Sequence, residues 1–250
     1  HAKKYGLDFV ETLCAKGCLS LLKLFTPDYL KVASRDLTNH PLLEAMAETK
    51  IPIIVSTGMA GKKELDEAIE IITKYHSNLS SIHCVSQYPH HPDNLNLSTI
   101  TYLKKHYGRY RIGFSDHTIG ISAPSIAVGM GAEIIEKHIT IDRNMKGTDQ
   151  AGSLGPDGIY RMVRDIRVTE RWMGKEELYI DSCVQNAKIK LERSIATNKN
   201  LHIGDIICEE DLHMLSPGDG FKWSQIQDVI GKKVIMDIPK NEIIYNHMIQ

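Results

Sequence analysis

Short apolar runs alternate with amphipathic segments up to about residue 174. The runs are rich in the β-branched residues that strands favour, and they begin about 20 to 30 residues apart. They predict strands at residues 8–12, 29–34, 52–57, 80–85, 111–115 and 133–139. Apolar residues at helical spacing predict helices at 38–48, with Thr38 as N-cap, at 62–75 and at 158–173. The alternation favours an α/β fold in which helices cover a parallel sheet.

The number of strand–helix units distinguishes between two such folds. Six units are visible, whereas a closed (β/α)8 barrel of the TIM type has eight. An open doubly wound sheet is the alternative, but no G-x-G-x-x-G follows any predicted strand. The chain also opens at His1 without a methionine. We therefore predict a TIM barrel that lacks its first two strands, over residues 1–174.

The character of the sequence changes after this segment. Residues 175–189 are polar with some helical potential, which is typical of a linker. Residues 190–250 consist of short elements that turn formers such as Gly204–Asp205 and Pro239–Asn241 interrupt. We predict a small, mostly β second domain over 190–250.

Composition and charge exclude several classes of partner. The net charge is −1, so no basic field attracts nucleic acid or an anionic membrane. No apolar run approaches the ~18 residues of a membrane-spanning helix. Cys14 and Cys18 lie one helical turn apart, but no second pair completes a zinc signature. Free thiols suit a reducing compartment, so we expect a cytoplasmic protein.

Polar, reactive side chains recur where the predicted strands end. In α/β barrels the C-terminal ends of the strands and the loops that follow them build the active site. Asp149 lies in such a loop, at residues 144–158, whose four glycines suit either a plain connection or a segment that covers substrate. The candidates at the strand ends are Thr12, Lys31, Ser34, Ser86, Tyr88, Ser115, His117, Glu136 and His138.

The last predicted strand directs unlike residues to its two faces. Side chains alternate along a strand, so Glu136 and His138 share one face and Lys137 occupies the other. His117 and His138 end successive strands, which are neighbours in a parallel barrel. Two imidazoles with Glu136 or Asp149 nearby suit a divalent ion such as Mn²⁺, Co²⁺ or Zn²⁺. Each histidine taken alone is equally compatible with a structural role. We assign no chemistry to Lys137.

A second candidate group surrounds Lys31. A lysine in an apolar strand pairs with a charge or extends to solvent. If Lys31 points into the site, it and nearby hydroxyls hold a phosphate or a carboxylate. Tyr88 either anchors its loop or contacts a ligand. The hydroxyls belong to Thr12, Ser34, Ser86 and Ser115.

These strand ends, in this order, resemble the sialic acid synthase family, that is, N-acetylneuraminate synthase and its bacterial relatives. The matching segments are KVASRDLTN, VSTGMA, HCVSQYP, GFSDHTIG and IEKHIT. The tail, with LHIGDIICEEDL, SPGDGF and IGKKVIMDI, resembles the antifreeze-like SAF domain at the C-terminus of that family. The resemblance covers essentially the whole chain and agrees with a barrel that lacks its first strands.

The resemblance implies a condensation of phosphoenolpyruvate with an N-acylated amino-aldose. The products would be a nine-carbon 2-keto acid for surface polysaccharides and inorganic phosphate. It also implies a domain-swapped homodimer and a divalent metal, Mn²⁺ foremost with Mg²⁺ or Co²⁺ as alternatives. The roles it implies are metal binding by His117 and His138, phosphoenolpyruvate binding by Thr12, Lys31, Ser34, Ser86 and Ser115, and sugar binding by the catalytic residues Tyr88, Glu136 and Asp149, with Glu136 also a candidate for proton transfer.

Three positions depart from the family pattern. Arg35 replaces a glycine beside the anion site, and residues 147–150 read GTDQ where the family has GPDH, which keeps Asp149. Ser216 replaces an arginine that reaches the partner subunit's site and touches the acyl-amino group, so the exact aldose stays open. The family's first strands also supply a glutamate and a lysine, so we expect these 250 residues alone to be impaired.

Two other functions remain open at this point. One is a phosphoenolpyruvate-using synthase of the 3-deoxy-octulosonate or deoxy-heptulosonate phosphate type, which takes a phosphorylated aldose; the SAF-like tail argues against it. The other is a non-catalytic protein that keeps the barrel and the SAF domain for binding or assembly.

Overall fold

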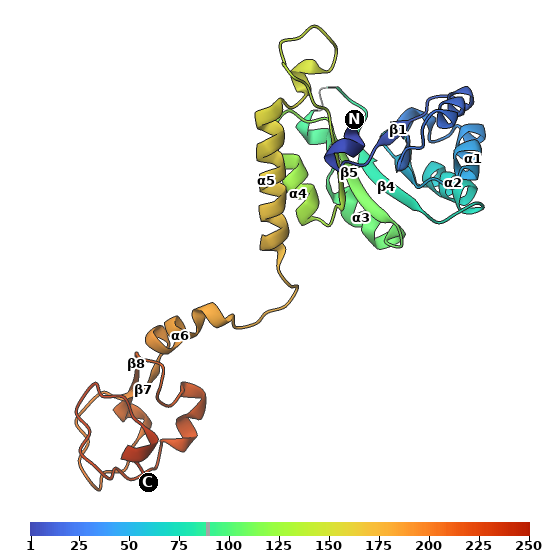
Figure 1. Ribbon diagram of the computed structural model, residues 1–250. Helices are drawn as coiled ribbons and strands as arrows, with labels where there is room; N and C mark the ends of the chain where they lie inside the picture. The colour runs from blue at the N-terminus through green and yellow to red at the C-terminus, as the bar shows by residue number, and fades with distance from the viewer. Residues whose placement is uncertain (89–90) are drawn as a thin grey trace. The chain divides into compact units, whose positions relative to one another are not determined.

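The computed structural model describes residues 1–88 and 91–250. The chain forms two compact units, His1–Lys175 and Glu176–Gln250, each with a hydrophobic core of its own (Figure 1). Among the described residues, none of the helices combines the length and the apolar character needed to cross a bilayer.

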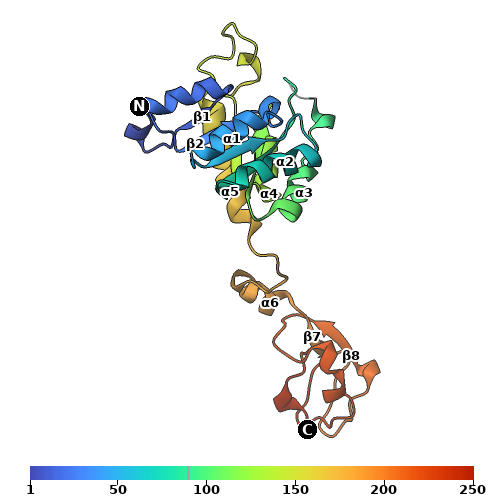
Figure 2. The ribbon, with the colours of Figure 1, turned by 90° about the vertical axis from the view of Figure 1, so that its right-hand side faces the viewer.

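The first unit is built on a six-stranded parallel sheet whose strands follow one another in sequence order. The sheet curls into a half-barrel with helices on its convex side (Figures 1 and 2). This confirms the predicted α/β barrel architecture with six units. The strands are β1 (Val10–Thr12), β2 (Tyr29–Val32), β3 (Ile53–Ser56), β4 (Leu79–Cys84), β5 (Arg111–Asp116) and β6 (Ile134–Lys137).

Among the described residues of this unit, five helices and several short 3-10 turns accompany the sheet. The helices are α1 (His40–Glu48), α2 (Lys62–Thr73), α3 (Ser98–Tyr107), α4 (Ser122–Gly129) and α5 (Pro156–Met173). The 3-10 turns are η1 (Ala2–Tyr5), η2 (Lys16–Lys23), η3 (Ser34–Asp36), η4 (Pro92–Asn94) and η5 (Gln150–Gly152). The predicted cap at Thr38 is wrong: α1 begins two residues later behind Asn39, with a proline in its first turn.

The two faces of the strands have different roles. On β5, Ile112 and Phe114 are completely buried in the core that the sheet shares with the helices. Ser115, the next residue, faces the concave side. On β6, the partners of Ser115 and Asp116 are Glu136 and Lys137, so the same alternation continues across the strand pair. The convex face therefore holds the fold together, and the concave face is left for a site.

The second unit is a small domain around a two-stranded antiparallel sheet and further isolated bridges. Its core gathers aliphatic residues from the whole segment, including Ile195, Leu201, Val234 and Ile244, each with at most 1% of its surface exposed. Its elements are η6 (Ser182–Val184), α6 (Gln185–Leu191), β7 (Ser194–Thr197), η7 (Glu209–Asp211), β8 (Leu212–Leu215), η8 (Trp223–Asp228) and η9 (Asn246–Met248).

Candidate active site

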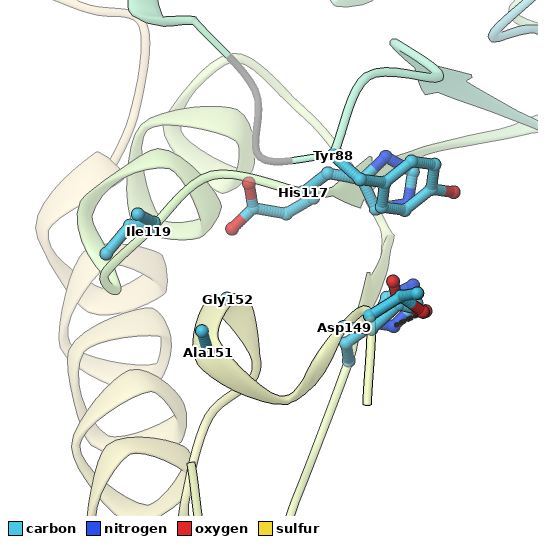
Figure 3. A pocket seen from close by; sticks show the side chains of 9 residues that line it. Tyr88, His117, Ile119, Asp149, Ala151 and Gly152 are labelled. Atoms are coloured by element: carbon cyan, nitrogen blue, oxygen red, sulfur yellow. Dashed lines mark ion pairs between the residues drawn. The ribbon is translucent and has the colours of Figure 1, made fainter. Parts of the chain in front are cut away.

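Two adjoining pockets open at the C-terminal ends of the strands. We call them the strand pocket, about 640 Å³, on the concave face of the sheet, and the loop pocket, about 480 Å³, against residues 148–152. Tyr88, His117 and His138 line both pockets, so they form the wall between them. Figure 3 shows the loop pocket, with Tyr88, His117 and Asp149 among the side chains that line it.

The predicted site residues divide between these pockets. Asp149 lines the loop pocket. Thr12 lines neither pocket: it is exposed at the end of β1, where Lys31 is its partner in the β1–β2 ladder. The predicted residues that line the strand pocket are Lys31, Ser34, Ser86, Tyr88, Ser115, His117, Glu136 and His138.

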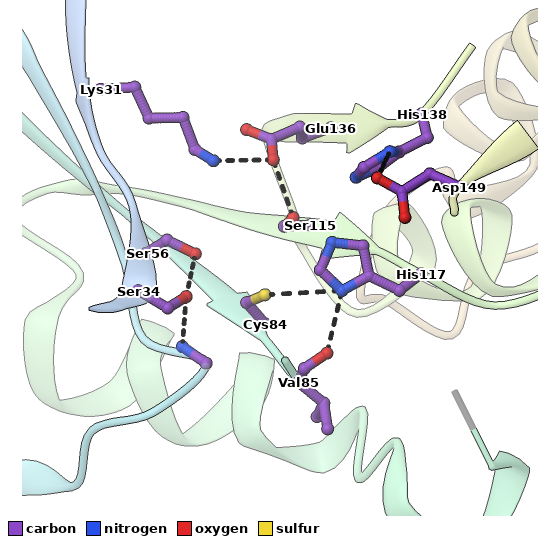
Figure 4. A network of polar contacts seen from close by, with 11 residues as sticks. Lys31, Ser34, Ser56, Cys84, Val85, Ser115, His117, Glu136, His138 and Asp149 are labelled. Carbon is purple, nitrogen blue, oxygen red and sulfur yellow. Dashed lines mark hydrogen bonds and ion pairs between the residues drawn. The ribbon is translucent and has the colours of Figure 1, made fainter. Parts of the chain in front are cut away.

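Lys31 is paired inside the strand pocket. Its Nζ lies 2.8 Å from Oε1 of Glu136, and the hydroxyl of Ser115 donates to the same oxygen at 2.9 Å (Figure 4). The Lys31 side chain is only 17% exposed. Of the two alternatives for Lys31, the structure therefore shows pairing. Glu136 belongs to the strand pocket with Lys31, and Asp149 faces the other pocket.

A cluster of hydroxyls lies beside this ion pair. Ser34 Oγ donates to Ser56 Oγ at 2.9 Å and accepts the backbone N–H of Gly58 at 3.0 Å. A Cβ added to Gly58 would lie 2.4 Å from Ser86 Oγ and 2.9 Å from Cys84 Sγ. Only a glycine lets the backbone approach the hydroxyls this closely. The cluster and Lys31 together present the donors that a phosphate or carboxylate accepts.

The two histidine rings lie close together, and Nδ1 of each ring has a polar contact. His117 Nδ1 lies 2.9 Å from the carbonyl oxygen of Val85, which can only accept, so Nδ1 carries a proton; in the neutral imidazole, Nε2 then keeps its lone pair. His138 Nδ1 lies 3.6 Å from Oδ2 of Asp149. The ring centroids of the histidines are 5.3 Å apart, and the ring of Tyr88 is 4.1 Å from that of His117.

This donor set suits a metal ion that receives its remaining ligands from elsewhere. An acceptor on Nδ1 fixes the tautomer and the orientation of an imidazole whose Nε2 binds a metal. Within residues 1–88 and 91–250, no three His, Cys, Asp or Glu side chains converge closely enough to hold an ion by themselves. Water or substrate oxygens therefore have to complete the coordination.

Cys84 lines the strand pocket, although its place in the sequence does not mark it as a candidate. Its Sγ lies 3.9 Å from His117 Nδ1. Burial raises the pKa of the Cys84 thiol, but hydrogen bonds from His117 and Ser56 outweigh it and lower the pKa to about 7. Burial lowers the pKa of His117, while its contacts with Cys84 and Val85 raise it, and the net shift is upward. A cysteine within an apolar strand resembles an ordinary core residue, which is why the pattern missed it.

Arg35 and Ser216, two residues that depart from the family pattern, each make a hydrogen bond in the structure. Arg35 lines the strand pocket, and its guanidinium donates to Cys14 Sγ at 3.0 Å. The hydroxyl of Ser216 donates to the carbonyl of Leu191 at 3.0 Å, within the second unit. Ser56, Met59, Ile119 and Thr148 also line the pockets and were not predicted.

Comparison with known proteins gives consistent results for both units. The NeuB family model matches residues 1–178, and the SAF domain model matches residues 192–250. N,N'-diacetyllegionaminic acid synthase of Legionella pneumophila is 34% identical over 95% of this chain and 68% of that protein. Human N-acetylneuraminate-9-phosphate synthase is 28% identical over 100% of this chain and 70% of that protein.

A solved structure agrees with these matches. N-acetylneuraminic acid synthetase from Leptospira borgpetersenii superposes with a TM-score of 0.70 at 37% identity, over 74% of this chain and 65% of that one. This chain thus spans about two thirds of the length of these relatives. The fold, the two domain matches and the identities agree, and the chain belongs to the NeuB family, with a SAF domain as its second unit.

Proposed function

We propose that this protein condenses phosphoenolpyruvate with an N-acylated amino-aldose, such as N-acetylmannosamine or a relative, to a sialic-acid-like nonulosonic acid for surface polysaccharides. The observation that carries the proposal is the wall of Tyr88, His117 and His138 between two pockets of different character. A reaction that joins two substrates needs two adjacent sites with the reacting atoms at their border. The names of the relatives, sialic and legionaminic acid synthases, support the same reaction class.

Phosphoenolpyruvate occupies the strand pocket in this proposal. Lys31 provides the positive charge, and the cluster around Gly58 provides hydroxyl donors for the phosphate and carboxylate oxygens. Thr12 contributes at the rim, next to Lys31 in the ladder. Glu136 contacts Lys31 and Ser115, so it is placed to move a proton at phosphoenolpyruvate.

The aldose occupies the loop pocket. Tyr88 and Asp149 line that pocket and bind the sugar hydroxyls. The ion, Mn²⁺ foremost with Mg²⁺ or Co²⁺ as alternatives, is held by His117 and His138, whose Nδ1 atoms face Val85 and Asp149. Bound there, it supplies positive charge to the aldehyde oxygen. We also propose a cytoplasmic, domain-swapped homodimer.

Phosphate release from phosphoenolpyruvate tests this proposal. Assays use the full-length protein and contain Mn²⁺ and one of three aldoses: N-acetylmannosamine, its 6-phosphate, or a diacetamido-trideoxyhexose. We expect release with at least one aldose and none without an aldose. His117→Ala and His138→Ala should abolish both release and Mn²⁺ binding, whereas His106→Ala, on the exposed surface of α3, should change neither. A protein that binds no divalent ion and releases no phosphate with any aldose is not this synthase.

A further inference from the structure

Each histidine of the site directly follows one member of a buried ion pair. Asp116 precedes His117 at the end of β5, and Lys137 precedes His138 at the end of β6. Lys137 Nζ lies 2.7 Å from Asp116 Oδ2, and the two side chains are 2% and 0% exposed. Asp116 and Lys137 are also the last partners of the β5–β6 ladder, on the face opposite Ser115 and Glu136. The pair is thus the last link between the two strands before the histidines.

The same pair holds the backbone on the far side of His117. Asp116 Oδ1 accepts the backbone N–H of Thr118 at 2.8 Å, and Lys137 donates to the carbonyl oxygen of Thr118. Residue 117 therefore lies between two residues that the ion pair fixes. His138 follows Lys137 directly, and its carbonyl oxygen accepts the N–H of Leu154 at 2.9 Å.

Fold stability alone is a poor reason for this arrangement. Moving two charges out of water costs so much that apolar replacements of buried ion pairs are often neutral or stabilising. The neighbouring convex-face residues, Ile112 and Phe114, are apolar and completely buried, as expected for positions that only pack. Directed bonds from Asp116 and Lys137 do what an apolar contact cannot, because they fix the positions of particular backbone atoms.

We propose that Asp116 and Lys137 are positioning residues that set the spacing and direction of His117 and His138, so that both Nε2 atoms face one divalent ion. This rests on the metal-binding role proposed above for the two histidines. The contact between the His138 ring and Asp149 cannot fix the ring position by itself. The two side chains are 37% and 46% exposed, so water competes for the same groups. The buried ion pair fixes the backbone beside the two histidines, and the contacts at Nδ1 of each ring fix which ring nitrogen carries the proton.

The decisive variant removes both charges together. In Asp116→Asn with Lys137→Met, the asparagine keeps an acceptor for Thr118 N–H, and no buried charge is left unpaired. We expect its thermal unfolding midpoint to stay close to that of the parent and its Mn²⁺ dissociation constant, followed by the paramagnetic resonance of free Mn²⁺, to rise about 10- to 100-fold. The matched control is Lys104→Met with Glu133→Gln, which removes an exposed pair of 2.9 Å beside the start of β6; it should leave Mn²⁺ affinity unchanged.

A folded double variant with parental Mn²⁺ affinity would overturn the inference and leave the proposed reaction intact. If the double variant does not fold, Lys137→Arg decides: it keeps the charge but not the two bond directions, so an affinity equal to that of the parent also overturns the inference. A parent that binds no Mn²⁺ overturns the metal role of the histidines, and the positioning role with it.

Discussion

Lys31 and Glu136 are 105 residues apart in the chain, and their side chains meet at 2.8 Å on the concave face of the half-barrel. The proposed anion site therefore already contains one anion, the Glu136 carboxylate. In the proposed reaction, a substrate phosphate or carboxylate would replace this carboxylate as the partner of Lys31. The affinity for the anionic substrate should then depend on Glu136 as much as on Lys31.

The first prediction separates binding from chemistry at this pair. Glu136→Gln keeps an acceptor for Ser115 but removes the negative charge that competes for Lys31. We expect the KM for phosphoenolpyruvate to fall about tenfold, or ~1.4 kcal/mol. We expect kcat to fall about 10²- to 10⁴-fold, because the group proposed for proton transfer is lost. Lys31→Met should instead raise KM. Steady-state phosphate release measures both constants, and an unchanged KM in Glu136→Gln would contradict the exchange.

The second prediction concerns the close approach at Gly58. In Gly58→Ala the new methyl group would overlap Ser34 Oγ, Ser86 Oγ and Cys84 Sγ, at 2.7, 2.4 and 2.9 Å. We expect the free energy of unfolding to fall by about 1–3 kcal/mol and the KM for phosphoenolpyruvate to rise. Gly17→Ala is the control, since a Cβ there meets nothing within 4 Å. Urea denaturation compares the two, and equal stabilities would argue against the packing described for Gly58.

The third prediction concerns the carboxylate beside His138. Asp149→Asn keeps the shape of the side chain but removes the negative charge that lies 3.6 Å from Nδ1 of His138. We expect Mn²⁺ to bind about tenfold more weakly. Asp157→Asn, at an exposed position of α5 where the aspartate pairs with Arg161, should bind Mn²⁺ like the parent. Calorimetric titration distinguishes them, and a similar loss in both variants would mean that only net charge matters.

The fourth prediction is a pH dependence of stability in the metal-free protein. The pKa of Cys84 is about 7 in the folded chain, below the ordinary thiol value of 9.0. The folded state therefore favours the thiolate, and the stabilisation is complete above pH 9 and is lost as the pH falls through 7. We expect the parent to gain on the order of 2 kcal/mol over Cys84→Ala between pH 7 and 9. Denaturation curves at several pH values measure this, and a constant difference would refute it.

The fifth prediction uses the two separate cores. Phe114→Ala should destabilise the first unit by about 3–5 kcal/mol, and Val234→Ala should destabilise the second by about 1–3 kcal/mol. The chain has two tryptophans, Trp172 in α5 and Trp223 in η8, so one lies in each unit. Fluorescence of Trp172→Phe and Trp223→Phe backgrounds then reports each unit by itself. If both core changes shift both signals equally, the units unfold as one.

Much of the fold could be predicted because the strands are short, continuous apolar runs, buried on at least one face. The structure ends several of them one or two residues earlier than predicted: the β6 ladder ends at Lys137, before His138. Helix α3 was not predicted, although Ile100, Leu103 and Tyr107 have helical spacing and are buried. Helix α4 was not predicted either. It has few polar residues, so its sequence does not show an apolar face that alternates with a polar one.

The candidate site was predictable to the extent that it follows strand ends. Barrel sites lie at those ends, and most residues chosen by this rule line one of the two pockets. Thr12, at the rim, is the predicted residue that lines neither. The partnership of Lys31 with Glu136 could not be predicted, because it depends on how far the sheet curls between β2 and β6. Lys137 was correctly placed on the opposite face, but its buried partner becomes visible only in the β5–β6 register.

The alternation along β6 also limits how this strand can evolve. Glu136 faces Lys31 in the strand pocket, and Lys137 faces Asp116 under the helices. Inserting or deleting one residue before Glu136 would exchange the two faces, which puts a carboxylate among buried apolar groups and a second lysine beside Lys31. Substitutions can be absorbed one at a time, whereas a single-codon insertion here disables the pocket and its support in one step. Among natural relatives, length variation should therefore collect in the loops on either side of β6, and not within it.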